Sequence, residues 1–225
     1  MKKFKFMALI LVLALGLLGA TYAAWWSSST SFGATIDTGV VDMRIRNGKP
    51  GHLPVYATVG DEGAFMEVDH TYDEKSVTVT IGNLYPVSKY QHGVKIGFGM
   101  QNYGSVPVKL RGIKFTKINE ESEAWDYLRI YGHISLWKDR GSSSPQSIWT
   151  ETFQHVYLKD LDTVVMNILK DVVVEPGYIV SFSSEDLDGN TIYIYLNPND
   201  DGVENVQGQS VGFTAEFDWV QYNYK

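Results

Sequence analysis

The chain has 225 residues, of which 44% are hydrophobic and 20% charged, so it can bury a core and is not globally disordered. Its formal net charge of −7 argues against a nucleic-acid partner, because phosphate binding requires clustered Lys and Arg. The sequence contains no Cys, which excludes disulfide scaffolds, thiol nucleophiles and cysteine-based zinc sites.

Residues 1–24 have the pattern of an export signal. Three lysines in the first five residues precede an apolar run over residues 6–18, and the small residues Ala23 and Ala24 follow. The run is shorter than the roughly 18–20 apolar residues of a membrane-spanning helix. We therefore expect cleavage by signal peptidase after Ala24, or after Ala23, and a secreted protein of the extracellular matrix or cell surface. An uncleaved membrane anchor is the alternative.

Residues 25–36 are predicted to form an extended N-terminal segment. Trp25, Trp26 and Phe32 place three large aromatic side chains in eight residues that are otherwise Ser and Thr. A free, apolar, extended terminus promotes aggregation unless another strand covers it. The segment is therefore expected either to dock in its own sheet or to add as a strand to a neighbouring subunit.

The rest of the chain, residues 37–225, reads as one all-β domain. Alternating apolar residues predict strands over 77–81, 94–100, 106–115, 128–130, 134–137, 178–182, 192–196 and 211–219. Gly112 breaks the alternation of the third strand and indicates a β-bulge there. A short stretch with an acidic start predicts a helix over 120–127, and apolar residues at three- and four-residue spacing predict one over 155–170. This pattern favours a jelly-roll-like β-sandwich with one or two short inserted helices.

Motifs for catalysis are missing. The sequence has neither G-x-S-x-G nor H-E-x-x-H, and none of its five His pairs with another at a spacing of three or four. We therefore expect no enzymatic activity, with a metalloenzyme as a remote alternative. Asp186, Asp188 and Asn190 offer oxygen ligands at alternate positions, which is either a calcium site or ordinary turn chemistry.

Two further stretches allow more than one interpretation. Tyr193 and Tyr195 alternate along a strand, which indicates either a platform for stacking sugars or cross-strand packing pairs. Acidic residues flank His70 inside the stretch 49–73, where a solvated loop is the favoured interpretation.

Six ordered motifs resemble one known family. They are GATYAA at 19–24, ATIDTGVVDM at 34–43, VTVTIGNLYP at 77–86, FGMQNYGSVPV at 98–108, LKDL at 158–161 and QSVGFTAEFDWVQYN at 209–223. Together they are similar to the camelysin/TasA family of exported biofilm-matrix fibre subunits, which has archaeal bundling pili as structural relatives. The stretch 49–73 has no counterpart in that pattern.

The resemblance implies a jelly-roll subunit that forms a head-to-tail homopolymer by donor-strand complementation, with lateral bundling of filaments as a further association. The donor residues it implies here are Trp25, Trp26, Ser28, Thr30 and Phe32, and signal cleavage would free them. The alternative function is a monomeric cell-surface adhesin or carbohydrate-binding module of the same fold, with residues 25–32 in its own sheet.

Overall fold

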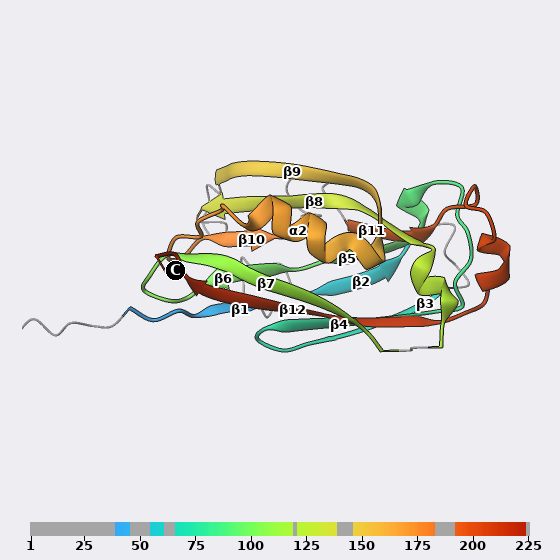
Figure 1. The fold of residues 1–225 in the computed structure, drawn as a ribbon, viewed down its shortest axis with the longest axis horizontal. Helices are drawn as coiled ribbons and strands as arrows, with labels where there is room; N and C mark the ends of the chain where they lie inside the picture. Colours follow the sequence, from blue (N-terminus) through green and yellow to red (C-terminus); the bar gives the residue numbers. More distant parts are fainter. Residues whose placement is uncertain are drawn as a thin grey trace, which may run out of the picture. The chain divides into compact units, whose positions relative to one another are not determined.

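The fold consists of two antiparallel β-sheets that pack face to face (Figure 1). The computed structural model describes residues 39–45, 55–60, 66–118, 121–138, 146–182 and 192–223. Within those residues the only α-helix is short, so the predicted all-β sandwich is confirmed.

The first sheet has eight strands. They are β1 (Met43–Ile45), β2 (Tyr56–Val59), β5 (Val94–Gly97), β6 (Gly99–Asn102), β8 (Leu128–Lys138), β9 (Gln146–Tyr157), β10 (Ile179–Ser181) and β11 (Ile192–Leu196). Strand β8 pairs along one edge with β9 and along the other with β10 and β11, which lie end to end. Strands β6 and β5 continue the sheet outward to β1 and β2.

The second sheet has four strands in the order β3 (Glu67–Tyr72), β4 (Ser76–Gly82), β12 (Val211–Gln221) and β7 (Val108–Lys117). The register of β12 against β7 shifts between Asp218 and Trp219, which face Gly112 and Leu110. One extra β7 residue lies between these pairs, so the bulge predicted at Gly112 is present.

The chain passes repeatedly from one sheet to the other, between β4 and β5, β6 and β7, β7 and β8, and β11 and β12. Such crossings place sequence neighbours on opposite faces of the core, as in a jelly roll. The residues from Gly39 to Lys225 form one compact unit.

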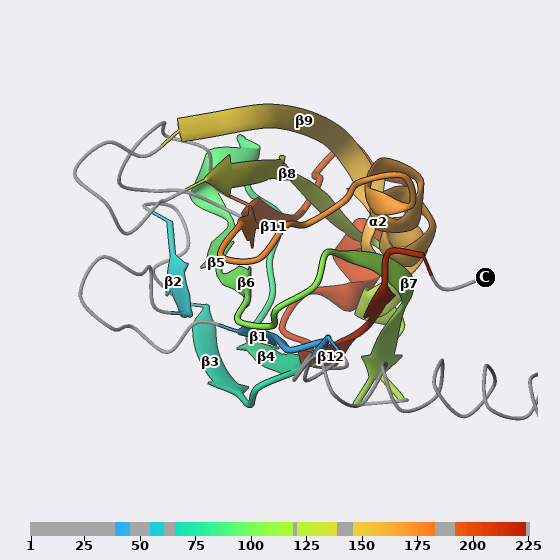
Figure 2. The ribbon, with the colours of Figure 1, turned by 90° about the vertical axis from the view of Figure 1, so that its left-hand side faces the viewer.

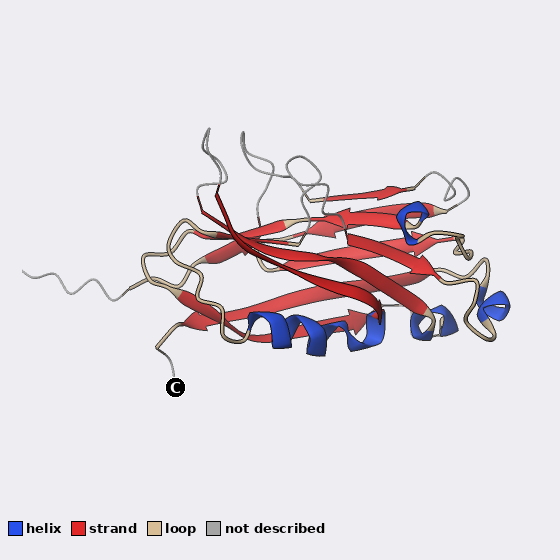
Figure 3. Cartoon of the chain, turned by 90° about the horizontal axis from the view of Figure 1, so that it is seen from above, coloured by secondary structure: helices blue, strands red, loops and turns tan. Residues whose placement is uncertain are grey.

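A helix closes one side of the sandwich. Helix α2 (Leu161–Leu169) packs against β7 and β9 and buries Leu161, Val165 and Leu169 (Figures 2 and 3). It begins later than the predicted 155–170, because residues 155–157 end β9 and Leu158–Asp160 form a 3-10 turn, η4. The other helix, predicted over 120–127, is the 3-10 turn η3 (Glu123–Asp126); η2 (Tyr90–His92) and η5 (Val203–Val206) are also 3-10 turns.

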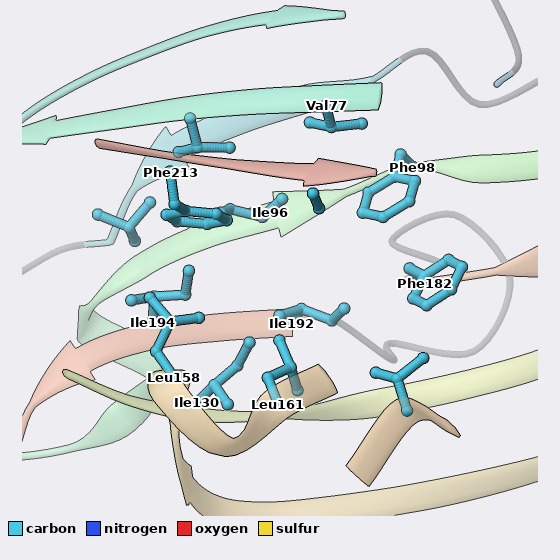
Figure 4. Close-up of a cluster of buried hydrophobic side chains, with 14 of the residues drawn as sticks. Val77, Ile96, Phe98, Ile130, Leu158, Leu161, Phe182, Ile192, Ile194 and Phe213 are labelled. Atoms are coloured by element: carbon cyan, nitrogen blue, oxygen red, sulfur yellow. The ribbon is translucent and has the colours of Figure 1, made fainter. Parts of the chain in front are cut away.

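The core lies between the sheets and is apolar (Figure 4). The rings of Phe98 and Phe182 stack with centroids 4.6 Å apart, and Phe217 from the opposite sheet packs against both. Phe213 and Phe217 are buried, as the alternation of 211–219 predicts, so this strand turns one face to the core.

Several strands differ from the sequence-based prediction. The strand predicted over 94–100 is divided at Phe98 into β5 and β6, and the two predicted over 128–137 are the single strand β8. Strands β1, β2, β3 and β9 were not predicted, because β1 and β2 have only three and four residues and most residues of β3 and β9 are exposed. The loop expected around His70 is wrong, since His70 lies in β3 and its Nε2 lies 3.2 Å from the carbonyl oxygen of Val55.

Candidate functional site

Strand β12 extends beyond its neighbour β4. Strand β4 pairs with β12 only as far as Glu216, opposite Ser76, whereas β7 pairs with β12 as far as Gln221. Among the described residues, no strand pairs with the last part of β12 on the β4 side. The second sheet therefore has an open backbone edge in its interior, next to β4.

The direction of the open hydrogen-bonding groups follows from strand geometry. The backbone N–H of Phe217 donates to the carbonyl oxygen of Lys75 at 3.3 Å, so Phe217 faces the β4 side. Alternate residues of a strand direct their backbone groups to the same edge. The N–H and C=O groups of Trp219 and Gln221 therefore face the open side, where an added strand could pair with them.

A groove of about 800 Å³ runs along this edge. Its walls are residues 41–44 of the β1 segment, residues 73–76 of the turn between β3 and β4, residues 112–114 of β7 and residues 216–219 of β12. The groove thus joins the edge of the first sheet to the open edge of the second.

Ion pairs occupy the rim of the groove. Arg44 contacts Asp42 at 2.5 Å and Glu74 at 3.0 Å, and Arg111 contacts Asp218 at 2.6 Å. The hydrogen bond to Asp42 is the main reason why the pKa of Arg44 is raised. Five acidic side chains line the groove against three basic ones, so it disfavours an acidic occupant and accepts an uncharged one. The acidic residues are Asp42, Asp73, Glu74, Glu216 and Asp218, and the basic ones are Arg44, Lys75 and Lys114.

Asp73 shapes the turn between β3 and β4. Its carboxylate accepts hydrogen bonds from the backbone N–H groups of Lys75 and Ser76, both at 2.7 Å. The bond from Lys75 is the largest of the effects that lower the pKa of Asp73. The turn is therefore held in place at the point where β4 begins and the open edge of β12 starts.

Two features of the groove indicate room for an occupant. The indole Nε1 of Trp219 is buried and has no hydrogen-bond partner among the described residues. A Cβ atom added to Gly112 would meet nothing within 4 Å. The unmet buried donor costs about 1–3 kcal/mol, and the open space beside Gly112 gives the groove room at β7.

The chain enters the sandwich beside this groove. Asp42 O accepts a hydrogen bond from the backbone N–H of Tyr103 at 2.7 Å, and Val40 O accepts one from that of Ser105 at 3.0 Å. At Gly104 an added Cβ would lie 2.1 Å from Val40 O, so only glycine allows this close approach. The turn after β6 therefore anchors the segment that follows residue 38.

The cleavage, donor and calcium residues predicted from the sequence all lie outside the described residues. These are the cleavage residues Ala23 and Ala24, the donor residues Trp25, Trp26, Ser28, Thr30 and Phe32, and the calcium residues Asp186, Asp188 and Asn190. The groove itself was not predicted, because its walls come from four separate stretches of the chain. The one sequence signal at this place was the break in alternation at Gly112.

The described residues show two further absences. They contain no group of three or more His, Asp or Glu side chains that could hold a metal ion. None of the helices within these ranges is long and apolar enough to cross a membrane.

Fold and groove together define an all-β sandwich with an open strand edge inside one sheet. Comparisons with protein-family models, curated proteins and solved structures gave no match. The resemblance to the camelysin/TasA family therefore rests on the sequence motifs alone.

Proposed function

We propose that this protein is a secreted structural subunit of an extracellular filament, a biofilm-matrix fibre or pilus. The N-terminal segment of one subunit adds as a strand to the open edge of β12 in the next. The observation that carries the proposal is this edge, where β12 continues past Glu216 without a described neighbour on the β4 side. The role is structural rather than catalytic.

The composition of residues 25–32 suits the groove. The segment carries no charge, so the excess of acidic over basic side chains in the groove lining does not repel it. An added strand would pair its backbone with Trp219 and Gln221 and place alternate side chains against the sandwich. Trp25, Trp26 and Phe32 supply the apolar area, since large aromatics bury about 150–250 Å² each.

Strand addition of this kind is head-to-tail. Each subunit uses one surface to donate and a different surface to accept, so the contact does not close on itself and generates a filament. Cleavage after Ala24 would free the donor, which explains why an export signal precedes an aromatic segment.

The test compares two versions of the chain by electron microscopy, one starting at Trp25 and one at Gly33. We expect filaments from the first and monomers from the second. Monomers from both would favour the alternative of a monomeric surface module. Filaments from both would place the contact outside residues 25–32 and contradict strand donation.

Because the chain enters beside the groove, the segment could also fold back into the groove of its own subunit. Dilution separates the two arrangements. Exchange between subunits makes the assembled fraction fall on dilution, whereas a self-filled groove gives monomers at every concentration.

A further inference from the structure

An aromatic cluster lies where η2, β8, β9 and β11 meet. Tyr90 of η2 packs on Tyr131 of β8 with ring centroids 4.2 Å apart, and Tyr193 lies 5.5 Å from Tyr90. Tyr193 is the cross-strand partner of Tyr131, and Tyr195 is only 6% exposed. Cross-strand packing therefore accounts for Tyr193, whereas Tyr195, whose cross-strand partner is Arg129, lines a pocket together with the partly exposed Tyr90.

This pocket has a volume of about 430 Å³ and opens to solvent. Tyr90 and Gln91 line it from η2, Arg129 from β8, His155 from β9, and Asn197 from the end of β11. A volume of this size accommodates a small ligand, and the wall combines an aromatic ring with planar polar groups.

The pocket wall carries positive charge on a protein of net charge −7. Arg129 and Lys89 line it, and no Asp or Glu does. Arg129 is already engaged, because it donates to Asp200 at 2.6 and 2.7 Å and lies over the ring of Tyr157 at 4.6 Å. Lys89 has no ion pair within the described part of the chain, so its ammonium group is available to an anionic ligand.

The backbone is strained at the same pocket. His155 has φ of +55°, in the left-handed region that L-residues other than glycine seldom adopt. It lies where the register of β9 against β8 shifts, and its Nδ1 is hydrogen-bonded to the Tyr195 hydroxyl. Strained residues cluster at ligand sites, because the surrounding structure must hold a side chain in one direction.

We propose that this pocket binds an acidic saccharide, with a sugar ring packed against Tyr90 and a sugar carboxylate paired with Lys89. A saccharide presents an apolar C–H face beside a hydroxyl edge. The face matches the aromatic ring, and the hydroxyl groups match the amide of Gln91 and the imidazole of His155, which line the pocket; the Asn197 amide is already bonded to Asn199 and Asp200. The proposal is independent of filament formation, because the pocket shares no residue with the groove.

The test is isothermal titration of the purified protein with tetragalacturonate, and with maltotetraose as the neutral tetrasaccharide. We expect tetragalacturonate to bind at one site and maltotetraose to bind at least about tenfold more weakly, because a hydrogen bond to a charged group is the stronger kind. Lys89→Met should weaken binding of tetragalacturonate by about tenfold or more. Lys170→Met, which removes an exposed lysine elsewhere, is the matched control and should have no effect.

Tyr90→Ala should abolish binding, and Tyr72→Ala, at an exposed tyrosine of β3, is its control. Circular dichroism distinguishes a loss of binding from a loss of folding. If Tyr90→Ala unfolds the protein, the affinity of the folded Lys89→Met variant still tests the proposal. Failure of the folded protein to bind tetragalacturonate, or equal affinity in Lys89→Met, would overturn the proposal. Equal binding of maltotetraose would overturn the assignment to acidic saccharides.

Discussion

Single residues decide how much space the groove offers. Gly112 has neither a positive φ nor a close neighbour, so its backbone does not require glycine. Nearby, the Trp219 indole is the buried donor without a described partner. Position 112 can therefore be changed without straining the fold, and the change acts on the groove alone.

We predict that Gly112→Trp abolishes filaments while leaving the thermal unfolding midpoint nearly unchanged. Gly112 lines the groove from β7, so the indole would take up groove volume beside β12, and a Cβ at this position meets no atom within 4 Å. Gly112→Ala is the matched control, because it adds a side chain too small to block the groove. Electron microscopy and thermal unfolding of both variants provide the measurement, and normal filaments from Gly112→Trp would contradict the proposed acceptor site.

The buried hydroxyl of Tyr195 gives a prediction for pH. Burial raises the pKa of Tyr195 to about 12, above the value near 10 of an unfolded tyrosine. The unfolded chain therefore loses this proton first as pH rises, and stability falls between pH 10 and 12. A shift of this size corresponds to about 2–3 kcal/mol.

We expect Tyr195→Phe to flatten this fall in unfolding free energy between pH 10 and 12, measured by urea denaturation. Tyr72→Phe, at an exposed site, should leave the slope as it is. A slope that stays the same in Tyr195→Phe would mean that other groups cause the loss of stability.

At the scale of elements, β12 has two different edges over its last residues. On one side β12 pairs with β7 as far as Gln221. On the other side its pairing with β4 stops at Glu216, opposite Ser76, the first residue of β4. The alternation that turns Phe213 and Phe217 to the core predicts the inner face of β12, but not which edge is paired. The length of the unpaired edge depends on the residue at which β4 begins, and the turn held by Asp73 determines that residue.

Proline substitutions separate the two edges. Gln221→Pro removes an N–H that faces the open side, so we expect nearly unchanged stability and weaker assembly. Val220→Pro removes an N–H that faces β7 and leaves an acceptor of β7 unpaired, so it should lower stability by about 1–3 kcal/mol. Thermal unfolding and filament yield of the two variants, measured side by side, test the assignment. A large loss of stability in Gln221→Pro would show that this edge is already paired.

For the whole molecule, the proposed donor (residues 25–32) and the proposed acceptor groove belong to separate stretches of the chain, so each can be removed without the other. A chain starting at Gly33 keeps the groove but has no donor segment. The Gly112→Trp variant keeps the donor but has a blocked groove. Each should therefore stop growth at one end of the filament.

We predict that either variant, added at a low ratio to the chain starting at Trp25, shortens the filaments in proportion to the amount added. The double variant, with neither donor nor acceptor, should have no effect and is the control. Filament lengths from electron micrographs provide the measurement. Full-length filaments at every ratio would contradict head-to-tail strand exchange.

The sequence by itself determined the class of the fold. Alternating residues such as Phe213 and Phe217 encode the inner face of a strand locally, and the break at Gly112 encodes the bulge. The strands β1 and β2 escaped prediction because three or four residues are too few to show alternation, and β9 because most of its residues are exposed. These segments become strands because they pair with β6, β5 and β8, which lie elsewhere in the sequence.

The tertiary structure alone decided the two candidate sites. Val41, Asp73, Gly112 and Trp219 are separated in sequence, and only the pairing of strands brings them to one groove. The same holds for Tyr90 and Tyr131, whose rings meet across the fold. Local periodicity reports which side of a strand is buried, whereas an open edge or a pocket depends on where other strands end.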